Sequence, residues 1–222
     1  MNSKINDFVI RFANVNGSGS ASANGMFAKA LFRMGIPVAT RNIFPSNIQG
    51  LPTWFEVRVS EKGYLGRREG VDIMVAMNAE TFAEDIDSIV PGGYLLYDNS
   101  KPLATELVRR DIHEIGMPIA TMLLPEFVDP KQRGLFKNIT YLGALAGLLN
   151  IEFDVITGMV ATQDKGKDAL IEPNIRALEL GRNYALEYLA APLPLQVKRS
   201  DAVGDRIMMG LPRLCFAWGF LS

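Results

Sequence analysis

A glycine- and serine-rich loop near the N-terminus is the stretch of this sequence whose residue types and spacing indicate chemistry. Residues 14–25 read NVNGSGSASANG, with an apolar run at 8–13 before them and an amphipathic segment at 22–34 after them. A glycine-rich turn between a strand and a helix directs backbone N–H groups and the positive end of the helix dipole at one point. Gly17 and Gly19 permit a positive φ angle or the close approach of a ligand. This arrangement predicts an anion site, with a phosphate as the typical occupant.

The serines of the loop have two interpretations. Ser18, Ser20 and Ser22 would add hydroxyl donors to an anion site, and serine is also a favourable helix N-cap. Taken alone, the loop is about equally consistent with a tight strand-to-helix turn that binds no ligand. It gives little support to a dinucleotide site, because Ser22 occupies the position where that fingerprint requires a third glycine.

A second stretch, FPSNIQGLP at residues 44–52, combines turn-forming residues with side-chain amides. Its two prolines fix part of the backbone, so the loop can be ordered without regular structure. Asn47 and Gln49 could contact a polar ligand or another subunit, or they could satisfy the backbone of a structural crossover. Both interpretations remain open. The candidate ligand-binding residues are Asn16, Gly17, Ser18, Gly19, Ser20, Ala21, Ser22, Asn47 and Gln49.

The sequence offers no recognisable catalytic apparatus. His113 is the single histidine, and we expect a structural role for it on a helix, because no nucleophile or ligand set accompanies it. The single cysteine, Cys215, excludes both an intrachain disulfide and a four-cysteine iron–sulfur cluster built by this chain. The acidic residues Glu84, Asp85 and Asp87 are expected on the solvent side of an amphipathic helix. We therefore predict no catalytic residue and no metal site on this chain.

Composition places the chain among ordinary globular proteins. Of 222 residues, 48% are hydrophobic and 21% are charged, with a formal net charge of −1. A charge so close to neutral does not favour a nucleic-acid partner. We find no apolar run long enough to span a membrane and no secretory signal peptide. These features predict a cytoplasmic protein with no membrane partner.

Strand and helix patterns alternate along the sequence. They predict strands at residues 8–13, 38–42, 53–59, 72–77, 94–97 and 119–123. They predict helices at 22–34, 78–89, 100–115, 138–149, 154–163 and 172–189, and irregular chain at 125–134. Such alternation favours a three-layer α/β/α, Rossmann-like fold with a mostly parallel sheet. A turn at 62–63 predicts a β-hairpin between 53–59 and 64–67, which makes the sheet mixed.

The sequence also suggests where the domain ends. We predict one α/β domain over residues 1–190, followed by a linker and a truncated or aberrant tail over 191–222. Residues 191–195, APLPL, have the composition of an interdomain linker. The last residues are apolar and aromatic without a helical or strand pattern, which favours self-association.

Three blocks of the sequence carry a family resemblance. FANVNGSGSASAN at 12–24, FRMG at 32–35 and FPSNIQGLPTWFEVR at 44–58 resemble the γ domain of 2-oxoacid:ferredoxin oxidoreductases. The resemblance is to the form fused at the N-terminus of the α subunit in 2-oxoglutarate-type enzymes. It extends from about residue 7 to residue 190, and PSNIQGLP is its most specific block.

The resemblance implies a function in a larger complex. These enzymes decarboxylate a 2-oxoacid on thiamine diphosphate, pass electrons through iron–sulfur clusters to ferredoxin and transfer the acyl group to coenzyme A. The γ domain is the part associated with coenzyme A, so the resemblance implies coenzyme A as co-substrate here. Thiamine diphosphate, magnesium and the clusters would lie elsewhere in the complex. The implied partners are the remaining α-subunit domains and the β subunit, with ferredoxin reached indirectly, in an oligomer.

One departure from the family pattern concerns the first loop. Many γ domains carry Gly-Gly-Gln-Gly there, whereas this chain reads GSGSA from Gly17, so the contacts of that glutamine do not carry over. We expect the chain to be inactive by itself. The alternative hypothesis is a stand-alone nucleotide- or phosphate-binding α/β protein without catalytic activity. Whether a thiamine-domain sequence follows in the same reading frame distinguishes the two.

Overall fold

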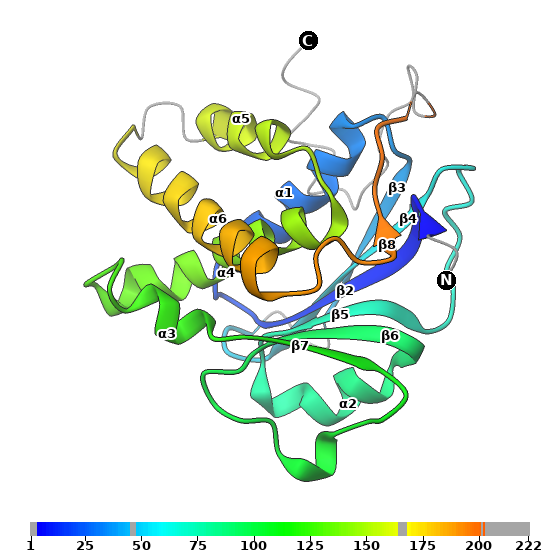
Figure 1. Cartoon of the computed structure of the whole chain (residues 1–222), viewed down its shortest axis with the longest axis horizontal. Helices are drawn as coiled ribbons and strands as arrows, with labels where there is room; N and C mark the ends of the chain where they lie inside the picture. The colour runs from blue at the N-terminus through cyan, green and yellow to red at the C-terminus, as the bar shows by residue number, and fades with distance from the viewer. Residues whose placement is uncertain (1–3, 45–47, 164–167, 201, 203–222) are drawn as a thin grey trace.

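The computed structural model describes residues 4–44, 48–163, 168–200 and 202, and within them six strands form the main sheet (Figure 1). Their order across the sheet is β3-β4-β2-β5-β6-β7. The strands are β2 (Asp7–Val15), β3 (Val38–Ile43), β4 (Pro52–Ser60), β5 (Val71–Ala76), β6 (Ile89–Asp98) and β7 (His113–Met117). A separate two-stranded sheet joins β1 (Lys4–Ile5) to β8 (Leu195–Gln196).

Helices cover both faces of the main sheet. They are α1 (Ser20–Arg33), α2 (Phe82–Asp87), α3 (Ile119–Leu123), α4 (Pro130–Leu149), α5 (Phe153–Gln163) and α6 (Asp168–Tyr188). Helices α1, α4, α5 and α6 lie on one side of the sheet and α2 on the other (Figure 1). The pairs β2–β5, β5–β6 and β6–β7 are parallel, whereas β4 is antiparallel to both β2 and β3. The predicted fold class, three-layer α/β/α with a mixed, mostly parallel sheet, is therefore confirmed.

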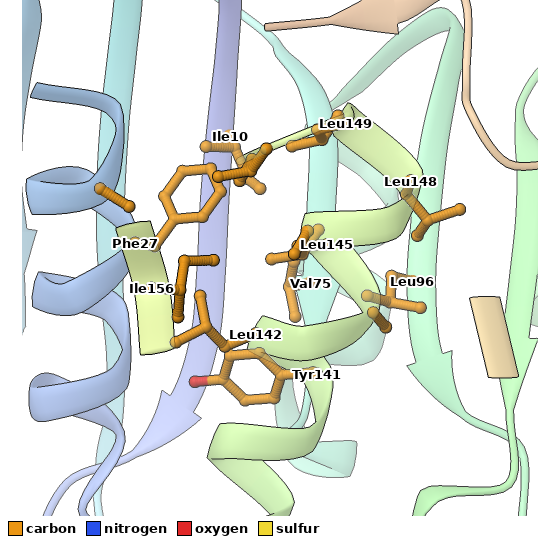
Figure 2. Close-up of a cluster of buried hydrophobic side chains, with 14 of the residues drawn as sticks. Ile10, Phe27, Val75, Leu96, Tyr141, Leu142, Leu145, Leu148, Leu149 and Ile156 are labelled. Carbon is orange, nitrogen blue, oxygen red and sulfur yellow. The ribbon is translucent and has the colours of Figure 1, made fainter. Parts of the chain in front are cut away.

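The main core lies between the sheet and the four-helix layer. Figure 2 shows side chains of β2, β5 and β6, such as Val75 and Leu96, gathered against Leu142 and Leu145 of α4. These residues are at most 1% exposed. All six residues of β5 are buried because helices cover both faces of the strand, and apart from Asp72 they are apolar. Each such side chain contributes about 1.5–3 kcal/mol of burial free energy.

The backbones of helices α4 and α6 lie in direct contact at two glycines. A Cβ atom added at Gly143 would lie 2.0 Å from the carbonyl oxygen of Leu178, and one at Gly181 would lie 1.9 Å from that of Thr140. Neither position can accept a side chain without separating the helices. This glycine contact fixes α4 against α6, and α4 is the helix that reaches the candidate site.

The prediction of a β-hairpin between residues 53–59 and 64–67 is wrong. Residues 53–59 do form a strand with Phe55, Val57 and Val59 buried on one face, but β4 pairs with β2 and β3. Because β4 lies between those two strands, neither of its edges is free to pair with residues 64–67. Those residues belong instead to the irregular connection from β4 to β5.

The predictions for residues 100–115 and 119–123 are also wrong. In place of a long helix, the chain forms a single 3₁₀ turn, η2 (Thr105–Leu107), and then enters β7. His113 thus lies on a strand, where its exposed ring stacks on Tyr94 with centroids 5.0 Å apart. Residues 113–117 form a strand because they pair in parallel with β6. The segment predicted as a strand at 119–123 is helix α3.

Several element boundaries differ from those predicted. The helix expected over 78–89 is the short turn η1 (Ala79–Thr81) followed by α2, and β6 already begins at Ile89. Helix α4 begins at Pro130, inside the segment predicted to be irregular, because the Asp129 side chain accepts a hydrogen bond from the Lys131 N–H and caps the helix.

Asp85 is not on a solvated face. It is 1% exposed and accepts hydrogen bonds from Trp54 Nε1 at 2.6 Å and from Thr81 Oγ1 at 2.7 Å. Burial raises the pKa of its carboxyl group, although both hydrogen bonds oppose that shift. The carboxylate therefore anchors the indole of β4 to helix α2.

The segment after residue 190 packs onto the main body. Leu193, Leu195 and Val197 are buried in the main core, and the Leu193 N–H donates to the carbonyl of Leu148 at 2.8 Å. Residues 191–195 thus do not span open solvent in the way their composition suggests. A domain division at residue 190 stays a prediction, and the tail at 203–222 lies outside the described residues.

Candidate functional site

A cavity of about 770 Å³ lies at the carboxyl end of β2, where helix α1 begins. The end of β3 and the start of β4 form another part of its wall. Five of the predicted residues line it, and side chains from α1, β3 and β4 that the sequence did not single out complete it. The lining residues are Asn16, Gly17, Gly19, Ser20, Ala21, Asn24, Gly25, Asn42, Phe44, Thr53 and Phe55.

The glycine loop adopts the conformation for which its glycines are suited. Gly17 and Gly19 have φ angles of 87° and 79°, in the left-handed region that side chains disfavour. Gly19 is the N-cap of α1, and no side chain caps the helix. The serines are therefore not N-caps: Ser20 is the first helical residue, and the N–H groups of the first turn lack intrahelical partners.

The glycine loop and residues 48–51 form one unit. The Asn16 N–H donates to the carbonyl of Leu51 at 2.8 Å, and the Gly50 N–H donates to the carbonyl of Asn16 at 3.0 Å. The side-chain amide of Asn16 also donates to the carbonyl of Ile48 at 3.0 Å. The structure thus brings together the two loops that the sequence separates by about thirty residues.

The side chain of Gln49 lies against Gly17. A Cβ atom at Gly17 would be 2.8 Å from Gln49 Cγ, so only glycine leaves this space to the glutamine. Gln49 itself is exposed and does not line the cavity. The other predicted amide, Asn47, lies outside the described residues. Their roles in binding stay predictions.

Side chains of helix α4 contact the glycine loop. The Asn138 side-chain amide donates to the carbonyl of Ser18 at 2.9 Å, and Leu135 packs against Gly19. The hydroxyl of Tyr141, a fully buried residue, donates to Asn24 Oδ1 at 2.6 Å and lies 3.3 Å from Asn14 Oδ1. These residues lie more than a hundred positions from the loop, so no local pattern could have indicated them.

Neutral hydrogen-bond donors dominate the cavity. Among the described residues that line it, none carries a formal charge. Ser18 and Ser22 do not line the cavity, and the buried atoms Ser18 Oγ and Asn14 Nδ2 have no hydrogen-bond partner among the described residues. The cavity can therefore recognise an anion through backbone N–H groups, amides and the α1 dipole, without an ion pair.

The buried hydroxyl of Tyr141 provides a test of this support. We expect Tyr141→Phe to lower the free energy of unfolding by about 1–2 kcal/mol, because Asn24 Oδ1 then loses its donor in a buried place. Urea denaturation measures the change. Tyr64→Phe is the matched control, since that ring is 73% exposed and its substitution should have no measurable effect. Equal stability of Tyr141→Phe and the parent chain would contradict the prediction.

Within the described part of the chain, no group of three or more His, Cys, Asp or Glu side chains is arranged to hold a metal ion. None of the described helices combines the length and apolar character that crossing a membrane requires.

Comparison with curated sequences identifies distant relatives. The chain is 23% identical over 204 residues to the 2-oxoglutarate oxidoreductase subunit KorA of Mycobacterium tuberculosis, covering 82% of this chain and 31% of the relative. It is 22% identical over 249 residues to the alpha subunit of 2-oxoacid:ferredoxin oxidoreductase 2 of Aeropyrum pernix, covering 92% of this chain and 39% of the relative. The chain thus spans about a third of the length of these proteins.

Solved structures share the fold. The 2-oxoglutarate:ferredoxin oxidoreductase of Magnetococcus marinus, solved with 2-oxoglutarate, coenzyme A and succinyl-CoA bound, superposes with a TM-score of 0.78 at 24% identity. That match covers 89% of this chain and 34% of the other. The gamma subunit of a keto/oxoacid ferredoxin oxidoreductase from Geobacter sulfurreducens gives a TM-score of 0.65 at 22% identity, covering 81% and 98%.

The family profile described as pyruvate ferredoxin/flavodoxin oxidoreductase matches residues 9–184, which is most of the chain. This range contains all six strands of the main sheet except the first two residues of β2. It also contains every residue that lines the cavity at the glycine loop. The resemblance found in the sequence is thereby confirmed, and the chain belongs to the pyruvate ferredoxin/flavodoxin oxidoreductase family.

Proposed function

We propose that this chain is the γ-type domain of a 2-oxoacid:ferredoxin oxidoreductase and that the cavity at its glycine loop binds coenzyme A. The observation that carries this proposal is the cavity itself, where a positive-φ glycine loop and the open N-terminus of a fourteen-residue helix meet. A structural neighbour solved with coenzyme A supports the choice of ligand, and relatives named as 2-oxoacid and 2-oxoglutarate enzymes support the type of complex. Among 2-oxoacids, 2-oxoglutarate is the leading substrate.

The phosphates of coenzyme A would bind at the start of α1. The N–H groups of Ser20 and Ala21, two residues that line the cavity, lie in its first turn. Gly17 and Gly19 bring no side chain between the ligand and the backbone. The side chain of Ser18 does not line the cavity, so the proposed donors are backbone N–H groups. A phosphate would thus replace its water shell with fixed neutral donors.

The remainder of the ligand would follow the wall formed by β3 and β4. Asn42 and Thr53 offer polar groups there, and Phe44, 46% exposed at the cavity mouth, offers an aromatic surface. Such a mixture of polar and aromatic groups suits the adenine and pantetheine portions of coenzyme A. Gln49 and Asn47 would contact the ligand or a neighbouring subunit from the adjoining loop.

Decarboxylation and electron transfer would take place on other parts of the complex. The thiamine diphosphate, magnesium and iron–sulfur clusters would be held by the remaining α-subunit domains and the β subunit, with ferredoxin as the acceptor. We therefore expect the isolated chain not to reduce a viologen dye with any 2-oxoacid. In this function the chain supplies the acyl acceptor site and contributes no catalytic residue.

The proposal predicts phosphate-dependent binding of coenzyme A. Calorimetric titration of the full chain with coenzyme A should give saturable one-to-one binding, whereas pantetheine, which lacks the phosphates, should bind at least about tenfold more weakly. The physical reason is that the donors at the α1 N-terminus face the phosphates. ATP is a control: if it binds as tightly as coenzyme A, the stand-alone nucleotide-binding alternative holds. Absence of coenzyme A binding, or equal binding of pantetheine, would contradict the proposed site.

A further inference from the structure

A second cavity, of about 460 Å³, lies at the carboxyl ends of β5 and β6. None of its lining residues belongs to the cavity at the glycine loop. It is enclosed by Met77 after β5, by Phe82 of α2, by the connection from β6 to η2, and by Lys137 of α4. The carboxyl end of an open α/β sheet is where such folds bind their ligands.

One wall of the second cavity is apolar. Phe82, Leu103 and Leu107 pack against the smaller hydrophobic cluster on the α2 side of the sheet and are only partly buried by it. Met77 continues this surface toward the main core. The remaining faces of these four side chains border the cavity, so a ligand with an apolar body would complete their burial.

Charged residues also line the cavity, and the carboxylate among them, Asp98, already has hydrogen-bond and ion-pair partners. Asp98 Oδ1 accepts hydrogen bonds from the N–H groups of Ser100 at 3.1 Å and Ala120 at 3.4 Å, and Asp98 Oδ2 lies 3.1 Å from Lys137 Nζ. Burial acts to raise the pKa of Asp98, but the hydrogen bonds from Ser100 and the charge of Lys137 outweigh it and hold the pKa below its ordinary value. Asp98 is thus a fixed anion with few acceptor sites left for a ligand.

The unused hydrogen-bonding capacity of these charged residues consists of donors. An ammonium group has three N–H bonds, so Lys137 keeps two after pairing with Asp98. Lys101, which also lines the cavity, is exposed. The cavity therefore combines apolar surface with cationic donors.

We propose that this second cavity binds a small organic carboxylate with a flat apolar body. The carboxylate would accept hydrogen bonds from Lys137 and Lys101, and the body would lie against Phe82, Leu103 and Leu107. This site is independent of coenzyme A and of the cavity at the glycine loop. A ligand there would be held between α2 and the N-terminal half of α4, the helix that also supports the glycine loop.

The probe for this site is 1-naphthoate, with its neutral isostere 1-naphthamide as the ligand control. Equilibrium dialysis against the full chain should show saturable one-to-one binding of 1-naphthoate with a dissociation constant on the order of 1 mM, typical of so small a ligand. We expect 1-naphthamide to bind about tenfold more weakly, because it lacks the charge that the lysines recognise. Equal binding of the two compounds would overturn the proposal.

Lysine variants locate the binding. Lys137→Met and Lys101→Met should each weaken 1-naphthoate binding by about tenfold. Lys131→Met, an exposed lysine at the start of the same α4 helix but outside the cavity, should leave it unchanged. Lys137→Met loses the ion pair with Asp98 and could therefore fold poorly. Because Lys101 is exposed, Lys101→Met should fold normally and tests the site on its own.

A titration with coenzyme A separates this proposal from the proposed function. Saturating coenzyme A should not displace 1-naphthoate, and 1-naphthoate should bind even if the chain binds no coenzyme A. Displacement by coenzyme A, or full binding to both cavity variants, would overturn the second site. Failure of coenzyme A binding alone would overturn the proposed function and leave this site supported.

Discussion

Gly181→Ala is expected to lower the free energy of unfolding by more than about 3 kcal/mol, a large part of the stability of an ordinary domain. The added methyl group would lie 1.9 Å from the carbonyl oxygen of Thr140 and 2.9 Å from the amide nitrogen of Ala144. Both atoms belong to the backbone of α4 and cannot rotate away. Helices α4 and α6 would have to separate, which exposes part of the main core. Urea denaturation followed by circular dichroism measures the effect.

Gly158→Ala is the matched control for this prediction. Gly158 also lies inside a helix, α5, but a Cβ atom there would meet nothing within 4 Å. Replacing a helical glycine at an open position should raise stability by about 0.5–1 kcal/mol. If the free energies of unfolding of the two variants differed by less than about 1 kcal/mol, the close backbone contact between α4 and α6 would be contradicted.

Gly19→Val is expected to reduce coenzyme A binding by at least about a hundredfold while leaving the chain folded. Gly19 has a φ angle of 79°, which a β-branched residue strongly disfavours, and its Cβ would lie 2.7 Å from Leu135 Cδ2. The loop would have to move, and the N–H groups at the start of α1 would lose their arrangement. We expect a stability loss of only about 1–2 kcal/mol, because the loop contributes little to the core. Calorimetric titration and thermal unfolding measure the two effects.

Gly92→Val separates backbone strain from ligand binding. Gly92 has a φ angle of 78°, close to that of Gly19, and open space around its Cβ position. It does not line the glycine-loop cavity. The control variant should therefore lose a similar amount of stability and retain coenzyme A binding. An unchanged coenzyme A titration in Gly19→Val would remove the glycine loop from the proposed binding site.

The local part of the site could be predicted from the sequence. Residues 8–13 and 22–34 were expected as the strand and helix around the loop, and the structure has β2 at Asp7–Val15 and α1 at Ser20–Arg33. Their apolar periodicity and the glycine loop between them are properties of neighbouring residues. The positive φ angles of Gly17 and Gly19 follow from the same local pattern. The alternation of such elements was also sufficient for the fold class.

The errors arose where the partner of a segment is distant in the sequence. Residues 53–59 have the alternation of a half-buried strand, but alternation does not state which strand lies beside it. The apolar spacing of residues 100–115 is compatible with a helix, and only pairing with β6 makes its end a strand. Residues 191–195 have a linker composition, yet their leucines fill the space left beside α4.

The sequence by itself determined the fold class, the family and the position of the glycine loop, because each of these depends on residues that are adjacent in the chain. Only the tertiary structure decided which other residues share the site. Asn42 and Thr53 reach the cavity because the end of β3 pairs with the start of β4, which pairs with the carboxyl end of β2. Asn138 reaches Ser18 from α4, which packs against α6 through two glycines. Such contacts depend on the packing of whole elements, whose free energy is gained only when distant segments exclude water together.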